Sequence, residues 1–296
     1  MPGEVVVAPA AGQAGAAGVV RVVLRHPGRL NAMSRAMWRE LRAVFDDLQR
    51  RTDVRCVMVE GDGDAFCAGG DISEYPDFRF DAERLRDFHE GDVWGGLSAM
   101  LACDVPIVAR IAGACMGAGV EIAACCDLRI AADTARFGAP IARLGFPMAP
   151  REAALVAGAV GVVTARQMLL EAATFGAADM LQRGFLSRVA PADELEREAL
   201  ASASRIAALA PGAARMNKQT LRAWQSSHLQ PPPQPQLQPQ LQPQPHLHLP
   251  PAQSEAAAFH HTAADHCAVT DPYAYADSAE HREGISAFLA KRPPVF

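Results

Sequence analysis

The stretch that most constrains the fold is residues 113–127 (GACMGAGVEIAACCD), which follows an apolar segment at residues 106–111 (PIVARI). The apolar segment has the length and composition of a buried strand. Glycine permits positive φ and close approach of another chain, so the spacing from Gly113 to Gly119 predicts a tight turn after that strand. The residues from Gly119 onward suit a helix, whose first N–H groups have no intrahelical partner. We therefore expect a turn that presents free N–H donors.

Glu121 is an acid within the apolar part of this stretch. Burying a carboxylate without a partner is costly, and burial raises its pKa toward the range that suits proton transfer. The alternative interpretation is an acid in the first helical turn that only complements the helix dipole. Both interpretations are open from this stretch alone.

Composition limits the class of protein. Half of the 296 residues are hydrophobic, which is enough for a sizeable core. The net charge of −5 provides no basic surface for nucleic acid or an anionic membrane. We find no signal-peptide pattern at the start and no apolar run of membrane-spanning length. The seven cysteines include no C-x-x-C pair, so we expect free thiols and a cytoplasmic protein.

The first third of the chain predicts a parallel β-α-β unit. Residues 19–26 and 54–60 are β-rich, and residues 34–51 between them have an apolar helical face with Ser34 as a plausible N-cap. Strand, helix, strand in this order indicates a right-handed crossover. Further helices are expected at residues 81–102, 193–209, 213–224 and 276–291, and a further strand at residues 127–131.

Three regions follow from the composition along the chain. Residues 1–190 form the predicted α/β core, and residues 191–227 and 255–296 form a helical C-terminal region. Between the two helical parts, residues 228–254 are rich in Pro, Gln, Leu and His and cannot pack as a core or as a helix interior. We predict a disordered insertion there.

A second glycine-rich loop, residues 61–71 (GDGDAFCAGGD), follows the strand at residues 54–60. Loops that follow parallel strands meet at the carboxyl edge of the sheet, where α/β proteins usually bind their ligands. We therefore expect the two glycine-rich loops to converge on one site.

Five motifs, in this order along the chain, together resemble the enoyl-CoA hydratase/isomerase (crotonase) superfamily. Each motif alone is a weak signal, whereas five in the right order are specific. They are RHPGRLNAMS (25–34), AFCAGGDI (65–72), the stretch at 113–127, ARFGAPIARLG (135–145) and AEHREGISAFLAKRPPVF (279–296).

The resemblance implies the fold and the partners. It implies an α/β crotonase (ClpP-like) spiral of β-β-α units with a C-terminal helical region that serves trimerisation. It further implies an acyl-CoA substrate and a homotrimer or a dimer of trimers. We expect no metal, no nucleic acid or membrane partner, and no cofactor other than the coenzyme A of the substrate.

The resemblance also implies site residues. The family's oxyanion hole, which holds the thioester oxygen, uses two backbone N–H groups that fall on Gly70 and Ala118. Such a donor is typically worth ~3–4 kcal/mol of barrier. The family's first catalytic carboxylate falls on Glu121. The substrate- and CoA-binding residues that it implies are Arg29, Ala68, Gly70, Asp71, Ile72, Ser73 and Lys291.

The second carboxylate of the family's hydratases falls on Ile141, which can neither donate nor accept a proton. Hydration benefits from one group that activates water and another that delivers a proton to Cα. Glu152, Asp71 and His89 are acids or bases that would compensate, and spacing does not choose among them.

Hydration of a 2-enoyl-CoA is the leading functional expectation. A single Glu suits proton transfer between Cα and Cγ, so isomerisation of 3-enoyl-CoA to 2-enoyl-CoA is the alternative. A third possibility is a non-catalytic CoA-binding relative that uses its Pro-rich segment for docking. Glu121 beside an intact oxyanion loop favours an enzyme.

Other function classes fit the sequence less well. The Gly113-x3-Gly117-x-Gly119 spacing departs from the dinucleotide-binding fingerprint, and the chain has no G-x-S-x-G elbow of a serine hydrolase. A histidine-rich cluster at residues 260–266 lacks a known zinc spacing, so a solvated helix face is the favoured interpretation.

Overall fold

The computed structural model of the chain describes residues 2–10, 17–228 and 271–296. The tract predicted to be disordered, residues 228–254, lies outside these ranges except for its first residue, and so does the histidine-rich cluster at residues 260–266.

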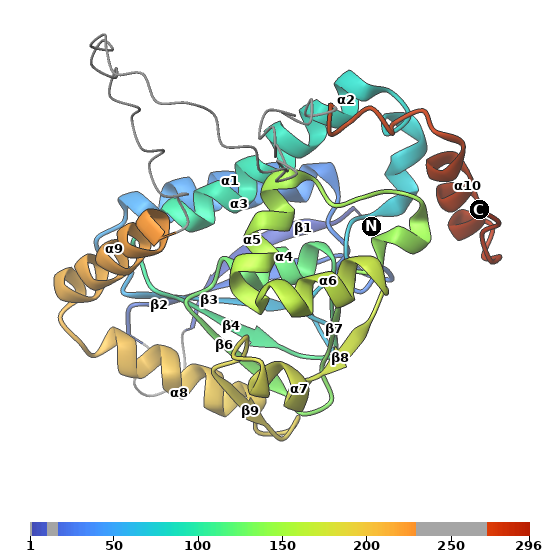
Figure 1. Ribbon diagram of the computed structural model, residues 1–296. Helices are drawn as coiled ribbons and strands as arrows, with labels where there is room; N and C mark the ends of the chain where they lie inside the picture. The colour runs from blue at the N-terminus through green and yellow to red at the C-terminus, as the bar shows by residue number, and fades with distance from the viewer. Residues whose placement is uncertain (1, 11–16, 229–270) are drawn as a thin grey trace, which may run out of the picture.

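Two β-sheets form the framework (Figure 1). The larger sheet has the order β1-β2-β3-β4-β6-β9, with β1 antiparallel to β2 and all other neighbours parallel. The smaller sheet has the order β5-β7-β8. The strands are β1 Glu4–Pro9, β2 Val19–Arg25, β3 Cys56–Gly61, β4 Ile107–Ile111, β5 Ala114–Met116, β6 Leu128–Ala132, β7 Arg136–Gly138, β8 Thr174–Gly176 and β9 Arg188–Ala190.

The predicted β-α-β unit is confirmed. Helix α1 (Arg35–Arg50) connects β2 to β3, which pair in parallel. The Ser34 side chain accepts a hydrogen bond from the Met37 N–H and so caps the helix, as its sequence position indicates. One face of α1 is buried through Met37, Trp38, Leu41, Phe45 and Leu48.

Helices cover both faces of the larger sheet (Figure 1). The side chains of β3 alternate between the two faces. Val57 and Val59 join the main core, which also contains the buried residues of α1, whereas Cys56 and Met58 pack with α8 (Leu195–Ala207). Burial on both faces explains why the strand contains the unbroken apolar run CVMV at residues 56–59 rather than an alternation of apolar and polar residues.

The helix expected at residues 81–102 is helical throughout but not uniform. It consists of α2 (Ala82–Arg86), a π-helical segment η2 (Asp87–Val93) and α3 (Trp94–Ala102). The π-helical segment carries the buried side chains of Phe88 and His89.

The remaining helices include those expected near the end of the chain. They are α4 Ala118–Ala124, α5 Pro150–Val160, α6 Val162–Leu170, α7 Ala177–Gln182, α9 Pro211–His228 and α10 Ala279–Leu289, with short 3-10 helices η1 Ile72–Asp77 and η3 Ile141–Leu144. Strand β1 and the three-residue strands β5 and β7 were not predicted.

Helix α10 is seated on η3 through two glycines. A Cβ at Gly284 would lie 2.2 Å from the Leu144 carbonyl, and a Cβ at Gly145 would lie 2.0 Å from the Glu280 carbonyl oxygen. Gly145 also has a φ of +71°, which favours glycine. The two backbones therefore touch, and this contact fixes where the residues after α10 lie.

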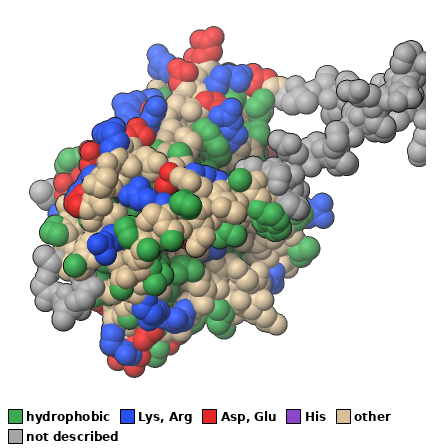
Figure 2. Space-filling model, turned by 90° about the vertical axis from the view of Figure 1, so that its left-hand side faces the viewer, with side chains coloured by type: hydrophobic (Ala, Val, Ile, Leu, Met, Phe, Trp, Pro, Cys, Tyr) green, Lys and Arg blue, Asp and Glu red, His purple; other side chains and the backbone are tan. Residues whose placement is uncertain are grey.

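Within the described ranges, no helix is both long and apolar enough to cross a bilayer. Figure 2 shows the face that includes the side of α8 and α9, where apolar side chains are scattered among charged ones. Helix α9 exposes Met216, Leu221 and Trp224. The trimer implied by the resemblance stays a prediction.

The seat of α10 predicts a local effect of Gly284→Ala. The added methyl group collides with the Leu144 carbonyl, and overpacking of this kind typically costs about 1–3 kcal/mol. We expect faster hydrogen–deuterium exchange in α10 and a lower melting temperature. Gly158→Ala in α5 is the matched control: its Cβ meets nothing within 4 Å, and it is expected to be neutral or stabilising. If both variants show the same exchange in α10 and the same melting temperature, the close backbone contact between α10 and η3 is contradicted.

Candidate active site

The two glycine-rich loops cross at the carboxyl edge of the larger sheet. The Phe66 N–H donates to the Ala112 carbonyl at 2.8 Å, and the Cys67 N–H donates to the Ala114 carbonyl at 2.9 Å. In the opposite direction, the Met116 N–H donates to the Cys67 carbonyl at 2.9 Å. The predicted convergence of the loops is therefore confirmed.

The glycines make this crossing possible. Gly113 and Gly117 have φ values of +49° and +48°. A Cβ at Gly119 would lie 2.5 Å from the Cys67 carbonyl oxygen, and one at Gly113 would lie 2.1 Å from the Asp64 carbonyl oxygen. The tight turn predicted from this spacing is present, and larger residues would separate the loops.

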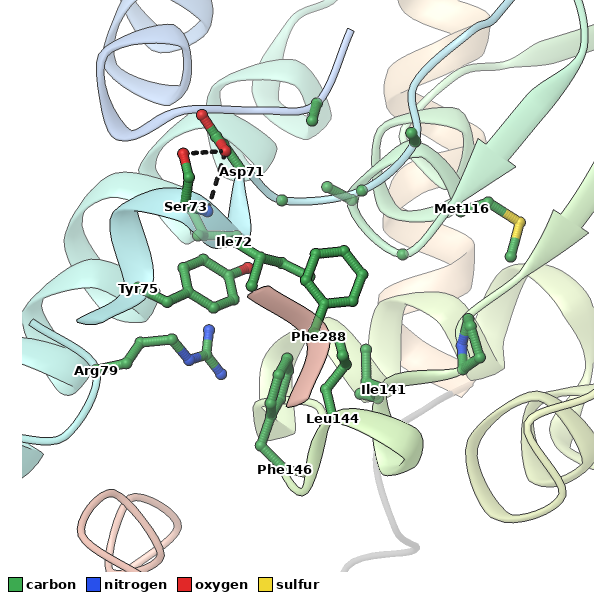
Figure 3. Close-up of a pocket in the computed structure, with 18 of the residues that line it drawn as sticks. Asp71, Ile72, Ser73, Tyr75, Arg79, Met116, Ile141, Leu144, Phe146 and Phe288 are labelled. Atoms are coloured by element: carbon green, nitrogen blue, oxygen red, sulfur yellow. Dashed lines mark hydrogen bonds between the residues drawn. The ribbon is translucent and has the colours of Figure 1, made fainter. Parts of the chain in front are cut away.

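A cavity of about 680 Å³ opens at the crossing. In Figure 3, Tyr75 and Arg79 enter from one side and point toward Phe146 and Phe288. The cavity brings together all of the residues that the resemblance assigned to the site, whose roles stay predictions. Its lining includes Arg29, Ala68, Gly70, Asp71, Ile72, Ser73, Ala118, Glu121 and Lys291.

Two backbone amides in the cavity wall are free to bind a ligand. In the described part of the chain, neither the Gly70 N–H nor the Ala118 N–H donates a hydrogen bond. A Cβ at Gly70 would lie 2.2 Å from the Tyr75 hydroxyl oxygen, so a larger residue at this position would require the buried Tyr75 side chain to move. Ala118 is the first residue of α4, where an amide has no intrahelical acceptor.

Glu121 lies one turn into α4 and is 6% exposed. Burial raises its pKa well above the ordinary value, and the charge of Glu152 raises it further, while Arg79 opposes the shift. Because its side chain also lines the cavity, the geometry supports the acid/base interpretation of Glu121 over a role limited to the helix dipole.

A second acid faces the same cavity from a different element. Glu152, in the first turn of α5, is buried, and its Oε1 lies 2.7 Å from His89 Nδ1 in a hydrogen bond. Burial raises the pKa of Glu152 to about 8, with Arg79 opposing and Glu90 adding to the shift. Burial and then Arg79 lower the pKa of His89 well below its usual value, so the ring is neutral at physiological pH.

Asp71 has a different task from the two glutamates. It accepts hydrogen bonds from the Ser73 N–H and hydroxyl (Figure 3). Arg29 Nη1 also donates to it, at 2.8 Å. These contacts hold the start of η1 and engage the Arg29 guanidinium. Of the three residues considered as substitutes for the missing second acid, Glu152 and His89 therefore remain.

Ile141 begins η3 and lies in the cavity wall, where the resemblance places the second carboxylate of the family's hydratases. A carboxyl group, that of Glu152, lines the same cavity from α5, the next helix. The 3-10 helix η3 and the turn at Gly145 separate Ile141 from Glu152 along the chain. The spacing of the sequence motif around Ile141 therefore did not single out Glu152 among the candidate acids.

Sequence reasoning missed Arg79 and Tyr75. The Arg79 side chain is almost fully buried, with its guanidinium carbon 4.3 Å from the Tyr75 ring centre and 3.9 Å from the Phe146 ring centre. A signal was available, because Arg79 stands between Phe78 and Phe80 in an aromatic stretch that favours burial. Within the described ranges, no group of His, Cys, Asp or Glu side chains is placed to hold a metal ion.

The raised pKa of Glu152 predicts a pH-dependent stability. An exposed Glu titrates near ~4.3, so between about pH 5 and 8 the folded state binds more protons than the unfolded state. The free energy of unfolding therefore falls as the pH rises through this window. Glu152→Gln cannot ionise, so we expect its melting temperature to rise relative to wild type between pH 5.5 and 8.5.

The matched control for this prediction is Glu83→Gln, which changes an exposed acid on α2. Its melting curve should follow wild type at every pH. If the melting temperatures of wild type and Glu152→Gln change in parallel with pH, the prediction that burial raises the pKa of Glu152 is contradicted.

Comparison with known proteins agrees with this geometry. The sequence profile of the enoyl-CoA hydratase/isomerase family matches residues 14–246. A probable enoyl-CoA hydratase of Mycobacterium tuberculosis is 36% identical over 207 residues, which are 70% of this chain and 79% of the relative. One from Mycobacterium leprae is 32% identical over 276 residues, 93% of each chain.

A solved structure supports the fold. The chain is similar to an enoyl-CoA hydratase/carnithine racemase from Magnetospirillum magneticum, with a TM-score of 0.69 and 29% identity over 95% of this chain and 92% of that one. The predicted α/β crotonase-type fold is thereby confirmed. The chain belongs to the enoyl-CoA hydratase/isomerase family.

Proposed function

We propose that this protein hydrates a 2-enoyl-CoA thioester, with Glu121 and Glu152 as a carboxyl pair and the Gly70 and Ala118 amides as the oxyanion hole. The observation that carries the proposal is the combination of two buried acids and two free amides in one cavity. Acyl-CoA as the substrate is what membership of the family implies.

The reaction needs the pair in its singly ionised state. The ionised carboxylate accepts a proton from water, whose oxygen forms a bond to Cβ of the enoyl group. Electron density moves through the double bond to the thioester oxygen, where the two amides stabilise the developing negative charge. The protonated carboxyl group then delivers its proton to Cα. The pair has lost this proton and gained one from water, so it is again singly ionised.

His89 supports this chemistry by holding Glu152. A neutral imidazole hydrogen-bonded at Nδ1 fixes the orientation of the carboxyl group. The ring of His89 in turn stacks on Tyr273, with 5.9 Å between the ring centres. Glu152 is therefore held rather than free to rotate, which is what a positioned acid or base requires.

The coenzyme A portion is assigned to the exposed rim of the cavity. Lys291 is exposed and makes no ion pair within the described ranges, so its ammonium group is available to a phosphate. Arg29 is about half exposed but shares its charge with Asp71, which makes it the weaker candidate. The hydration itself needs no further cofactor.

Isomerisation of a 3-enoyl-CoA is the second candidate, and Ile141 is the observation that favours it. Ile141 supplies no acid or base at that position, and isomerisation needs only one acid to move a proton from Cα to Cγ. Glu152 supports hydration over isomerisation, because it lines the same cavity as Glu121 and is the second group that hydration needs.

The carboxyl pair predicts the effect of two single substitutions. Glu121→Gln and Glu152→Gln should each lower kcat for crotonyl-CoA by about a hundred- to ten-thousand-fold, since each removes one partner of the proton transfers. Turnover is followed as loss of the absorbance of the conjugated thioester. Affinity for butyryl-CoA, a substrate analogue that cannot react, should change little because the backbone amides hold the thioester.

The Glu83→Gln variant serves again as the control and should keep full turnover. If Glu152→Gln also keeps it while Glu121→Gln does not, the enzyme uses one acid, and 3-hexenoyl-CoA should then be converted to its conjugated isomer. Tight binding of acyl-CoA by a wild type that catalyses neither reaction would contradict the proposal and favour a non-catalytic relative.

A further inference from the structure

Arg79 is a buried cation that forms no ion pair with any residue the structure describes. It is 1% exposed and lines the cavity, and no carboxylate of the described residues lies within 4 Å of it. A guanidinium group stays protonated in proteins, so its charge persists in this position. Burying an uncompensated charge is costly, and the surroundings must offset it.

The direct contacts of Arg79 are neutral. Its Nε–H donates to His281 Nε2 and its Nη2 to the Tyr275 hydroxyl, each at 3.3 Å. His281 is held as an acceptor because its Nδ1–H donates to the Ala276 carbonyl at 2.9 Å, and burial lowers its pKa to about 4. Two of the five N–H groups of Arg79 are thus occupied, and none of their acceptors carries a negative charge.

The two rings against which Arg79 packs are neutral as well. The guanidinium lies over both the Tyr75 ring and the Phe146 ring, whose planes are inclined at 69° to each other, and burial raises the pKa of Tyr75 to about 12. Cation–π contacts stabilise the cation but do not neutralise it. Figure 3 shows the guanidinium directed into the cavity beside these rings.

The acids that face the same cavity are therefore the available counter-ions. Glu121 comes from α4 and Glu152 from α5, and Arg79 opposes the upward pKa shift of both. Asp71, the other acid of the lining, is already paired with Arg29. Glu90 contacts Arg151 and the Tyr273 hydroxyl.

We infer that Arg79 is a positioning residue that favours the singly ionised state of the Glu121–Glu152 pair, with one carboxylate as its counter-ion. One fixed positive charge and one negative charge leave the closed site neutral, and a second ionisation would not be compensated. This is the state that hydration needs. The inference rests on the proposed function for its catalytic meaning, but the ionisation of the pair can be measured without turnover.

Two substitutions separate the charge of Arg79 from its hydrogen bonds. Arg79→Gln keeps an N–H donor for His281 or Tyr275 and removes the charge, whereas Arg79→Lys keeps the charge and loses the planar group. In Arg79→Gln, the acidic limb of the kcat/KM profile for crotonyl-CoA should move up by at least about one pH unit. At pH values below this limb, the shift lowers kcat/KM by at least about tenfold relative to wild type. In Arg79→Lys, the limb should stay near that of wild type.

A purely structural role of Arg79 gives a different pattern. If Arg79 had only this role, each substitution would lower kcat/KM by the same factor at every pH, and Arg79→Gln would retain more activity than Arg79→Lys. Either result overturns the inference. Arg166→Met is the matched control, because Arg166 is exposed on α6, and its profile should coincide with that of wild type.

A second measurement does not depend on activity. Carbon-13 NMR of protein labelled at the Glu carboxyl carbons follows both titrations, with Glu121→Gln and Glu152→Gln providing the assignments. The first ionisation of the pair should occur at higher pH in Arg79→Gln than in wild type, by at least about one unit. The same first ionisation in both proteins would overturn the inference even if the enzyme is a hydratase. A shifted ionisation in a protein that does not hydrate enoyl-CoA would uphold it and contradict the proposed function alone.

Discussion

Three backbone hydrogen bonds between the two glycine-rich loops hold the rest of the site in place. They join Phe66 and Cys67 to the segment from Ala112 to Met116. Gly70 and Ala118 line the cavity next to this crossing, and within the described ranges neither of their N–H groups donates a hydrogen bond. The loops themselves are fixed by the parallel pairing of β3 and β4, which brings both strand ends to one edge.

The groups around this crossing are ones that folding alone would not favour. Glu121, Glu152, His89 and Arg79 are all buried, and removing each from water costs free energy. The molecule offsets these costs with aromatic contacts, with neutral hydrogen-bond partners and with a large apolar core on both faces of the sheet. Burial also raises the pKa of both acids, to about 8 for Glu152, which favours a role in proton transfer.

Much of the fold follows from local sequence. Ser34 and the apolar face that follows it define α1, and the glycine spacing of residues 113–119 defines the turn that crosses the other loop. Strands of three residues, such as β5 and β7, carry too little pattern to be recognised, and they exist because the loops around them are already fixed. Glu152 could not be selected from spacing, since it enters the cavity through the fold of α5 against α4 rather than through a motif. Arg79 is understood only once the rings that enclose it are known.

Because α10 packs against η3, the cavity wall is built from two separate regions of the chain. The amides and acids belong to the loops and helices around the larger sheet, whereas Phe288, Leu289 and Lys291 come from the far end of the described chain. A substitution at Phe288 or Leu289 would reshape one wall of the cavity without changing the loops that cross at the edge of the larger sheet. Within this architecture, the shape of the cavity can diverge through the C-terminal helix while the loop crossing is kept by the core.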